Sequence, residues 1–162
     1  MIKTLAIKYR TIFRQFIKFG ITGTVGAVVD FSTYNFLTRL LDWQTIYTIL
    51  GAKIIAANLV SVFLAISSNF ILNKYWTFRD RSQNVAQQGA SYFTLNFITF
   101  VLNQLLTSYF VFQAPLLNVF GSQKDNAAKA LAIGIILFIN FLGSKFFIFR
   151  RKSTPPAPAI TI

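Results

Sequence analysis

Four long apolar segments alternate with short polar stretches along this chain of 162 residues. Each segment holds about 22 residues, and a helix needs about 20 apolar residues to cross the core of a bilayer. The segments lie near 19–41, 52–73, 90–112 and 127–149. The pattern predicts an all-α membrane protein whose transmembrane domain, residues 19–152, has four transmembrane helices.

The end of the second apolar segment returns at the end of the fourth. Asn69–Arg81 aligns without a gap to Asn140–Lys152, and we call these two stretches the exits. The identical pairs are Asn69/Asn140, Phe70/Phe141, Lys74/Lys145, Phe78/Phe149 and Arg79/Arg150. Each exit closes an apolar run with aromatic residues and then positive charge, which is typical of a helix leaving a membrane. The repeat predicts one two-helix hairpin used twice.

Both ends of the chain differ from the middle. Residues 1–18 place apolar side chains on one side of a helix and Lys3, Arg10, Arg14 and Lys18 on the other, which predicts a basic amphipathic helix on the membrane surface. The alternative is a basic flank that only orients the first span. Residues 153–162 form a Pro-rich stretch without periodicity, and we expect a disordered tail.

The basic residues predict the orientation in the membrane. Twelve of the 16 Lys and Arg residues fall on one side of the predicted spans, and Arg39, Lys53, Lys124 and Lys129 fall on the other. Because Lys and Arg are retained in cytoplasmic loops, we expect both termini in the cytoplasm and the protein in the inner or plasma membrane. Each hairpin then returns to its starting side, so the hairpins are expected to be parallel repeats (N-in/C-in).

Composition supports a membrane protein and excludes several kinds of active site. Hydrophobic residues make up 54% of the chain and charged residues 12%, against roughly 25% charged residues in soluble domains. The net charge of +12 could indicate nucleic-acid binding, but the basic residues lie between apolar runs rather than on one polar face. The chain has no His and no Cys, which excludes a Ser-His-Asp triad and His or Cys metal sites. We therefore expect no catalytic residue, metal or cofactor, and no enzyme activity.

Each predicted span carries a polar face, and we expect these faces to turn inward, away from lipid. The candidate substrate-binding residues on them are Asp30, Asn58, Asn69, Asn103, Lys129 and Asn140. For the Asn residues the simpler interpretation is that they are interhelical contacts that only hold the bundle together. Asp30 is different, because a charged Asp at mid-span costs about 2.5–3.5 kcal/mol and therefore marks a functional site by default.

The repeated exits also have two interpretations. Lys and aromatic residues at a membrane boundary can reflect orientation and an interfacial belt alone. Alternatively, Lys74, Arg79, Lys145 and Arg150 form a paired basic mouth that binds a lipid phosphate.

Through its two exits and the polar residues of its spans, the chain resembles the GtrA-like family of small membrane proteins. The matching residues are Phe16, Phe19, Gly20, Gly23 and Asp30 in the first span; Ala57-Asn58-Leu59, Ser68-Asn69-Phe70, Asn73-Lys74 and Trp76-Thr77-Phe78 in the second; and Lys129, Leu131-Ala132, Phe141, Lys145-Phe146 and Phe149 in the fourth. The third span matches by position and its Asn103. The resemblance implies a role in cell-surface polysaccharide synthesis, either translocating a polyprenyl-phosphate-linked sugar or supporting the glycosyltransferase that makes it.

Three functions remain open from the sequence. The first is translocation of a polyprenyl-phosphate-linked sugar, with membrane lipid as surroundings and a homo-oligomer as a way to enclose a large substrate. The second is a membrane anchor or regulator of a polyprenyl-phosphate glycosyltransferase, docked through the N-terminal helix and the middle loop. The third is a small multidrug-type transporter, which the strong charge bias of the loops disfavours.

Overall fold

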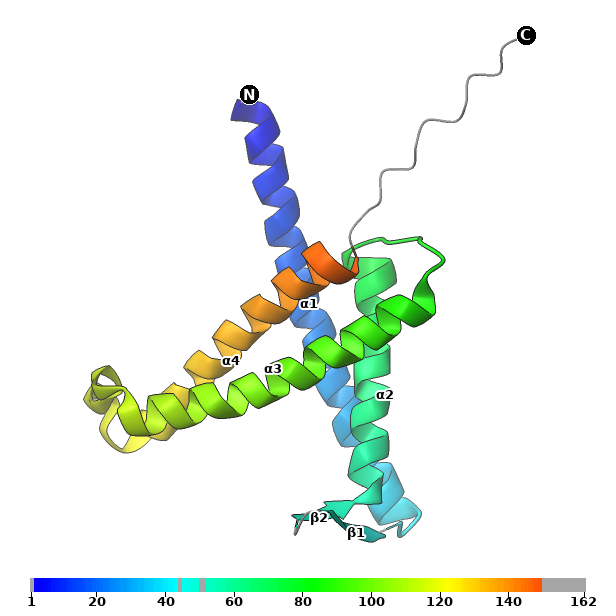
Figure 1. Ribbon diagram of the computed structural model, residues 1–162, viewed down its shortest axis with the longest axis vertical. Helices are drawn as coiled ribbons and strands as arrows, with labels where there is room; N and C mark the ends of the chain where they lie inside the picture. The colour runs from blue at the N-terminus through cyan, green and yellow to red at the C-terminus, as the bar shows by residue number, and fades with distance from the viewer. Residues whose placement is uncertain (1, 44, 50–51, 150–162) are drawn as a thin grey trace.

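The computed structural model describes residues 2–43, 45–49 and 52–149, and within these ranges the chain is helical apart from one short hairpin of strands (Figure 1). Four of its helices are long and apolar enough to cross a membrane: Tyr9–Leu40, Ala56–Thr77, Val85–Gln113 and Gly121–Ile148. The prediction of four apolar helices is confirmed, and the protein is a multi-pass membrane protein with four candidate spans. Arg150 and the predicted tail at 153–162 lie outside the described residues.

The elements follow one another in a simple order. The long helices are α1 (Ile2–Asn35), α2 (Ala56–Leu72), α3 (Val85–Gln113) and α4 (Lys124–Gly143). Three short π-helical turns extend them: η1 (Phe36–Leu40), η2 (Asn73–Thr77) and η4 (Ser144–Ile148). A 3-10 helix, η3 (Pro115–Gln123), joins α3 to α4. Strands β1 (Ile46–Ile49) and β2 (Ala52–Ile55) pair antiparallel between η1 and α2.

The start of the second helix differs from the prediction. Residues 52–55 were expected inside a span, but they pair with 46–49 in the strand hairpin, and α2 begins at Ala56. Both segments are rich in β-branched and aromatic residues, which favour strands, and a glycine separates them in the sequence. The prediction from the apolar run alone therefore started the second helix about one turn too early.

The N-terminal helix also differs from the prediction. Residues 2–18 are helical as expected, but α1 passes Lys18 without a break and continues to Asn35. The segment contains no proline, and sharp helix kinks need a specific cause such as proline. The 34 residues of α1 reach about 51 Å at 1.5 Å per residue, against a bilayer core of about 30 Å. The N-terminal part of α1 accordingly extends past the other helices in Figure 1.

The long helices form two hairpins that meet at the exits. α1 packs along α2, and α3 packs along α4, whereas the two hairpins run obliquely to each other (Figure 1). Both exits contain a π-helical turn at aligned positions, closed by Phe78 N–H to Asn73 O at 2.9 Å and by Phe149 N–H to Ser144 O at 2.8 Å. Over these aligned turns, the two copies of the sequence repeat have the same type of backbone.

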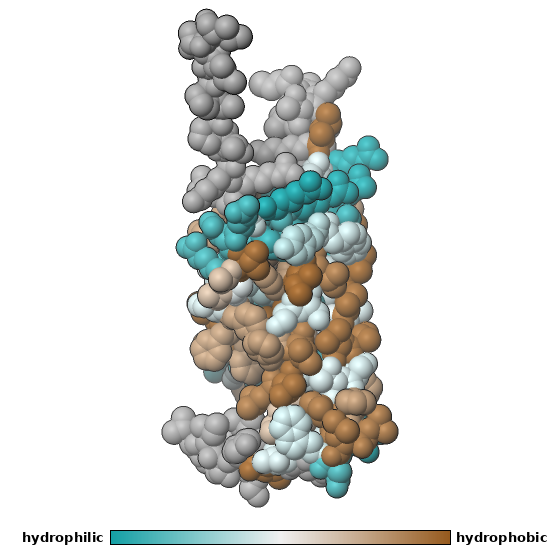
Figure 2. All heavy atoms as spheres, turned by 90° about the vertical axis from the view of Figure 1, so that its right-hand side faces the viewer, coloured by the Kyte–Doolittle hydropathy of each residue, from teal (hydrophilic) through white to brown (hydrophobic). Residues whose placement is uncertain are grey.

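The hydrophobic core lies where the hairpins meet. It consists of the buried residues Phe19, Phe70, Phe78, Tyr92, Phe141, Ile148 and Phe149. The rings of Phe78 and Phe149, one from each exit, stack with centroids 5.0 Å apart. Many other large apolar residues are exposed, such as Phe31, Phe97 and Phe112, and on the face in Figure 2 the surface beyond a hydrophilic band is mostly hydrophobic. An apolar exterior of this kind suits a lipid environment.

Candidate anion-binding pocket at the helix exits

A basic pocket lies between α1 and the two exits. Its volume is about 500 Å³. It is lined by Thr11, Arg14, Gln15, Lys18, Thr77, Phe78, Arg79, Lys145, Phe146 and Phe149. Four of these residues carry a positive charge, and none of the described lining residues is acidic. We call this space the basic pocket.

One face of α1 supplies the first wall. Thr11, Arg14, Gln15 and Lys18 follow the spacing i, i+3, i+4 and i+7, which puts them on the same side of a helix. Lys18 is held over Trp76 of the first exit: its Nζ lies 4.6 Å from the ring centre and donates to the Trp76 carbonyl at 3.5 Å. The predicted amphipathic segment therefore contributes two cations to the pocket, a role that the sequence analysis did not assign to it.

Arg79 enters the pocket from a strained backbone position. Its φ angle is +53°, a left-handed conformation that residues other than glycine seldom adopt. The following residue, Asp80, donates its N–H to the Lys74 carbonyl at 2.8 Å, which holds the chain in this turn just after η2. A strained backbone position persists only where surrounding contacts maintain it, and such positions cluster at functional sites. Here it directs an exposed arginine into the pocket wall.

The second exit supplies Lys145, and the first supplies a polar group without a partner. The half-buried Lys145 donates to Gln15 Oε1 at 2.8 Å and lies 5.5 Å from the Phe141 ring centre. Thr77 is 3% exposed, and its hydroxyl has no hydrogen-bond partner among the described residues. A buried hydroxyl that lacks a partner is costly, so this position favours a ligand that completes it.

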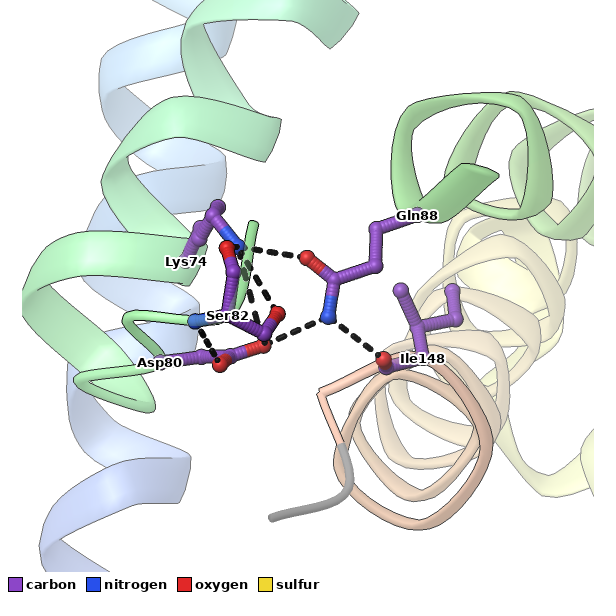
Figure 3. A network of polar contacts seen from close by, with 5 residues as sticks. All are labelled: Lys74, Asp80, Ser82, Gln88 and Ile148. Carbon is purple, nitrogen blue, oxygen red and sulfur yellow. Dashed lines mark hydrogen bonds and ion pairs between the residues drawn. The ribbon is translucent and has the colours of Figure 1, made fainter. Parts of the chain in front are cut away.

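The aligned lysine of the first exit has a different environment. Lys74 is fully buried, and its Nζ lies 3.7 Å from Asp80 Oδ2 (Figure 3). It also donates to the Ser82 carbonyl at 3.0 Å and to Gln88 Oε1 at 2.5 Å. Gln88 Nε2 in turn donates to Asp80 Oδ2 at 2.5 Å and to the Ile148 carbonyl at 3.1 Å. This network joins the first exit, α3 and the second exit.

The charge of Asp80 is stabilised by the same network. Burial alone raises the pKa of the Asp80 carboxyl group. Hydrogen bonds from the Ser82 backbone and the Gln88 side chain, together with the Lys74 charge, outweigh burial and lower that pKa below its ordinary value. Lys74 and Asp80 therefore form an ion pair that neutralises the buried lysine.

The two exit lysines make crossed contacts. Lys74 ends the first hairpin and bonds to Gln88 at the start of the second, while Lys145 ends the second hairpin and bonds to Gln15 at the start of the first. Sequence reasoning missed Gln15, Gln88 and the role of Asp80. A usable signal existed: each Gln precedes a core aromatic residue by four positions, Phe19 in α1 and Tyr92 in α3.

The structure separates the predicted phosphate-binding residues. Arg79 and Lys145 line the basic pocket, whereas Lys74 is enclosed in the buried network, and Arg150 lies outside the described residues. Of the four, two therefore share one described site, and Arg14 and Lys18 join them there.

The candidate substrate-binding residues of the spans lie elsewhere. Asp30 is half-buried and accepts a hydrogen bond from Ser61 at 2.5 Å, and Asn140 accepts one from Thr99 at 2.9 Å. The Asn69 side chain packs directly over Gly26. These contacts join helices within one hairpin. Asn103 is half-buried and Oδ1 of its amide has no partner among the described residues, while Asn58 and Lys129 are exposed. None of the six lines the basic pocket.

Comparison with known proteins gives one match. A search of curated proteins and of solved structures returned no similar chain. The family described as "GtrA/DPMS, transmembrane domain" matches residues 18–149, which include α1 from Lys18 onward, the other three apolar helices and the three π-helical turns. This domain is generally not catalytic itself, and it is linked in general terms to cell-surface polysaccharide synthesis. By its helices, its exits and this match over most of its length, the chain belongs to the GtrA/DPMS transmembrane domain family.

Proposed function

We propose that the protein moves a polyprenyl-phosphate-linked sugar across the membrane and binds the lipid phosphate in the basic pocket. The observation that carries this proposal is the gathering of Arg14, Lys18, Arg79 and Lys145 around one pocket at the meeting point of both hairpins. Arginine can bind phosphate oxygens through two parallel hydrogen bonds, and lysine adds a compact positive charge. Together they provide the donors that a phosphate group requires.

The pocket lies at the ends of two candidate spans, and this position fits a lipid better than a soluble anion. Thr77 ends the second candidate span and Ile148 ends the fourth, and the pocket lies beside these ends. Lipid phosphates occupy the same boundary between hydrocarbon and water. The prenyl chain could then stay against the apolar exterior of the helices, while the phosphate enters the pocket.

We place the basic pocket on the cytoplasmic side, with both termini there. Support comes from the excess of Lys and Arg around the exits and the start of α1, because basic residues are retained in the cytoplasm. Both exits share one aromatic cluster, which supports two hairpins that start and end on the same side. In this orientation the pocket receives a lipid-linked sugar made at the cytoplasmic surface.

In this proposal the polar residues of the spans contact the sugar. Asp30, with Ser61 beside it, would accept hydrogen bonds from sugar hydroxyl groups part-way across the membrane. The amides of Asn69, Asn103 and Asn140 and the exposed Asn58 and Lys129 would offer further contacts. The oblique hairpins leave these residues on separate helix pairs, so a homo-oligomer would help enclose the sugar.

Reconstitution in liposomes tests the proposal. The full chain is incorporated with a fluorescent short-chain prenyl-phosphate sugar, and movement between leaflets is followed by quenching of the outer label. Arg79→Gln combined with Lys145→Gln should slow movement at low substrate by at least about tenfold, since one lost charged hydrogen bond costs about 1.5–3 kcal/mol. The matched control is Arg39→Gln with Lys124→Gln, which removes two charges outside the pocket. Equal rates for both double variants would refute the pocket's role, and no movement by the wild type would refute translocation.

A second function is favoured by the N-terminal part of α1, which extends past the other helices (Figure 1). There Tyr9 and Phe13 are exposed at 69% and 64%, and they lie on one side of the helix at the spacing i, i+4. This surface would dock a polyprenyl-phosphate glycosyltransferase and make the protein its anchor. Tyr9→Ser with Phe13→Ser should abolish co-purification with the transferase, while the pocket double variant should retain it. Retained co-purification of the surface variant would contradict the anchor function.

A further inference from the structure

We infer that the basic pocket binds the bare lipid phosphate, a phosphomonoester, more tightly than the sugar-loaded lipid, a phosphodiester. This inference rests on the proposed function, since it concerns the ligand of the same pocket. It assigns the pocket to the carrier after its sugar has left, and so gives the protein a role in returning that carrier as well as in moving the loaded one.

The charge of the basic pocket favours the phosphomonoester. Arg14, Lys18, Arg79 and Lys145 bring four positive charges to the pocket, and no described lining residue offsets them. The nearest exit carboxylate, Asp80, is paired with the buried Lys74 instead. A phosphodiester carries one negative charge, whereas a phosphomonoester carries about 1.5–2 at pH 7. Each cation therefore gains a second charge to interact with when the monoester binds.

The number of hydrogen-bond donors in the pocket also favours the phosphomonoester. A phosphodiester has two non-bridging oxygens, while a monoester has three. Besides the four cations, the pocket wall contains the Thr77 hydroxyl, which lacks a partner among the described residues, and the Thr11 hydroxyl. The lining thus supplies donors for a third terminal oxygen. In a phosphodiester the third oxygen bears the sugar, and it is a weaker hydrogen-bond acceptor than a terminal oxygen.

The preference for the phosphomonoester should also depend on pH. The charged groups that face the pocket are Arg14 and Lys18 on α1, Arg79 after η2, and Lys145 on η4. The chain contains no His or Cys, the side chains whose ordinary pKa values lie nearest neutrality. The second ionisation of a phosphomonoester has a pKa near 6, so the ligand itself changes charge between about pH 5.5 and 7.5.

The inference places the protein beside a defined class of reaction. Transfer of a sugar from a prenyl phosphodiester breaks the bond between the sugar C1 and a phosphate oxygen. A bond forms between C1 and the acceptor hydroxyl oxygen, the hydroxyl proton passes to the phosphate or to water, and the phosphomonoester remains. A glycosyl transfer on the far side of the membrane must therefore supply the ligand. The loading glycosyl transfer on the pocket side consumes it again.

The experiment compares two probes that differ in one charge. The full chain is placed in nanodiscs of zwitterionic phosphatidylcholine and titrated with farnesyl phosphate or with its methyl ester, a phosphodiester. We expect farnesyl phosphate to bind at least about tenfold more tightly at pH 7.5, the effect of one additional charged hydrogen bond. The preference should shrink as the pH falls to 5.5, while binding of the methyl ester should stay constant.

Variants and competitors define the site and the source of the phosphate. Arg79→Gln changes an exposed side chain and should remove most of the preference without loss of helicity, whereas Arg39→Gln at the opposite helix end should leave it intact. Inorganic phosphate and phosphatidate are added as competitors. Displacement by inorganic phosphate at equal concentration would overturn a lipid ligand, and displacement by phosphatidate as effective as by farnesyl phosphate would overturn a prenyl carrier.

The main outcomes separate this inference from the proposed function. Tighter binding of the monoester, with the expected pH dependence, supports the inference. Equal affinities for the two probes overturn it but leave the proposed phosphate pocket standing. Failure of the wild type to bind either probe overturns both.

Discussion

The two exit lysines align in the sequence but should behave in opposite ways when replaced. Lys74 is fully buried, and Lys74→Met removes the cation that pairs with Asp80 at 3.7 Å. It leaves a carboxylate that is only 6% exposed without its cation, and Gln88 Oε1 without its donor. Removing one partner of a buried ion pair costs about 3–5 kcal/mol. Lys145→Met loses a hydrogen bond at a half-buried site, which is worth about 0.5–1.5 kcal/mol.

The assay is equilibrium unfolding in detergent micelles, followed by the fluorescence of the chain's two tryptophans. Lys74→Met should lower the free energy of unfolding by at least about 1.5 kcal/mol more than Lys145→Met does. Conversely, Lys145→Met should weaken phosphate binding while its fold stays close to wild type. Adding Asp80→Leu to Lys74→Met should recover part of the lost stability, because a buried ion pair can often be replaced by apolar residues of similar size. Equal destabilisation by the two single variants would refute this account of the exits.

Three further predictions address the backbone, the helix contact and pH. Arg79→Gly should relieve about 1 kcal/mol of backbone strain at φ +53° and also weaken phosphate binding. The control Arg81→Gly should not raise the free energy of unfolding. Equal changes in the free energy of unfolding for the two variants would contradict strain at Arg79. Gly26→Ala places a methyl group against the Asn69 side chain and should lower the free energy of unfolding by about 1–3 kcal/mol. Gly23→Ala places its methyl group in open space and should leave the free energy of unfolding unchanged or raise it. The same unfolding assay compares the two variants. Because the folded-state pKa of Asp80 is lowered, its contribution to stability is complete above the ordinary value of 3.8 and is lost as pH falls through the lower folded value. Asp80→Asn should abolish that component of an acid titration of stability, and an unchanged profile would contradict it.

The apolar helices could be predicted because lipid imposes a simple rule on sequence. A spanning helix must be apolar over about 20 residues, and this requirement leaves a clear signal in hydropathy. The same signal does not distinguish a helix from a strand over a few residues, which explains the error at 52–55. It also cannot predict where a helix protrudes from the membrane, so the continuity of α1 past Lys18 had to come from the structure.

The basic pocket could be predicted only in part, for a different physical reason. Positive charge at the exits was visible in the sequence, and Arg79 and Lys145 do line the pocket. Which lysine becomes neutralised depends on the turn after η2, which brings Asp80 back over Lys74. No periodic pattern encodes such a turn. The aligned position in the second exit is Arg151, so the sequence itself already held one asymmetry between the copies.

The crossed contacts between the hairpins have a consequence for how the molecule can be divided. Each exit lysine finds its glutamine on the opposite hairpin, so neither hairpin contains all the groups that complete its own last turn. Expressed as separate polypeptides, each half would lack the hydrogen bond between its exit lysine and the glutamine of the other half until the two met. We therefore expect the two halves to associate through these two hydrogen bonds and the shared aromatic core, whether or not one peptide chain links them.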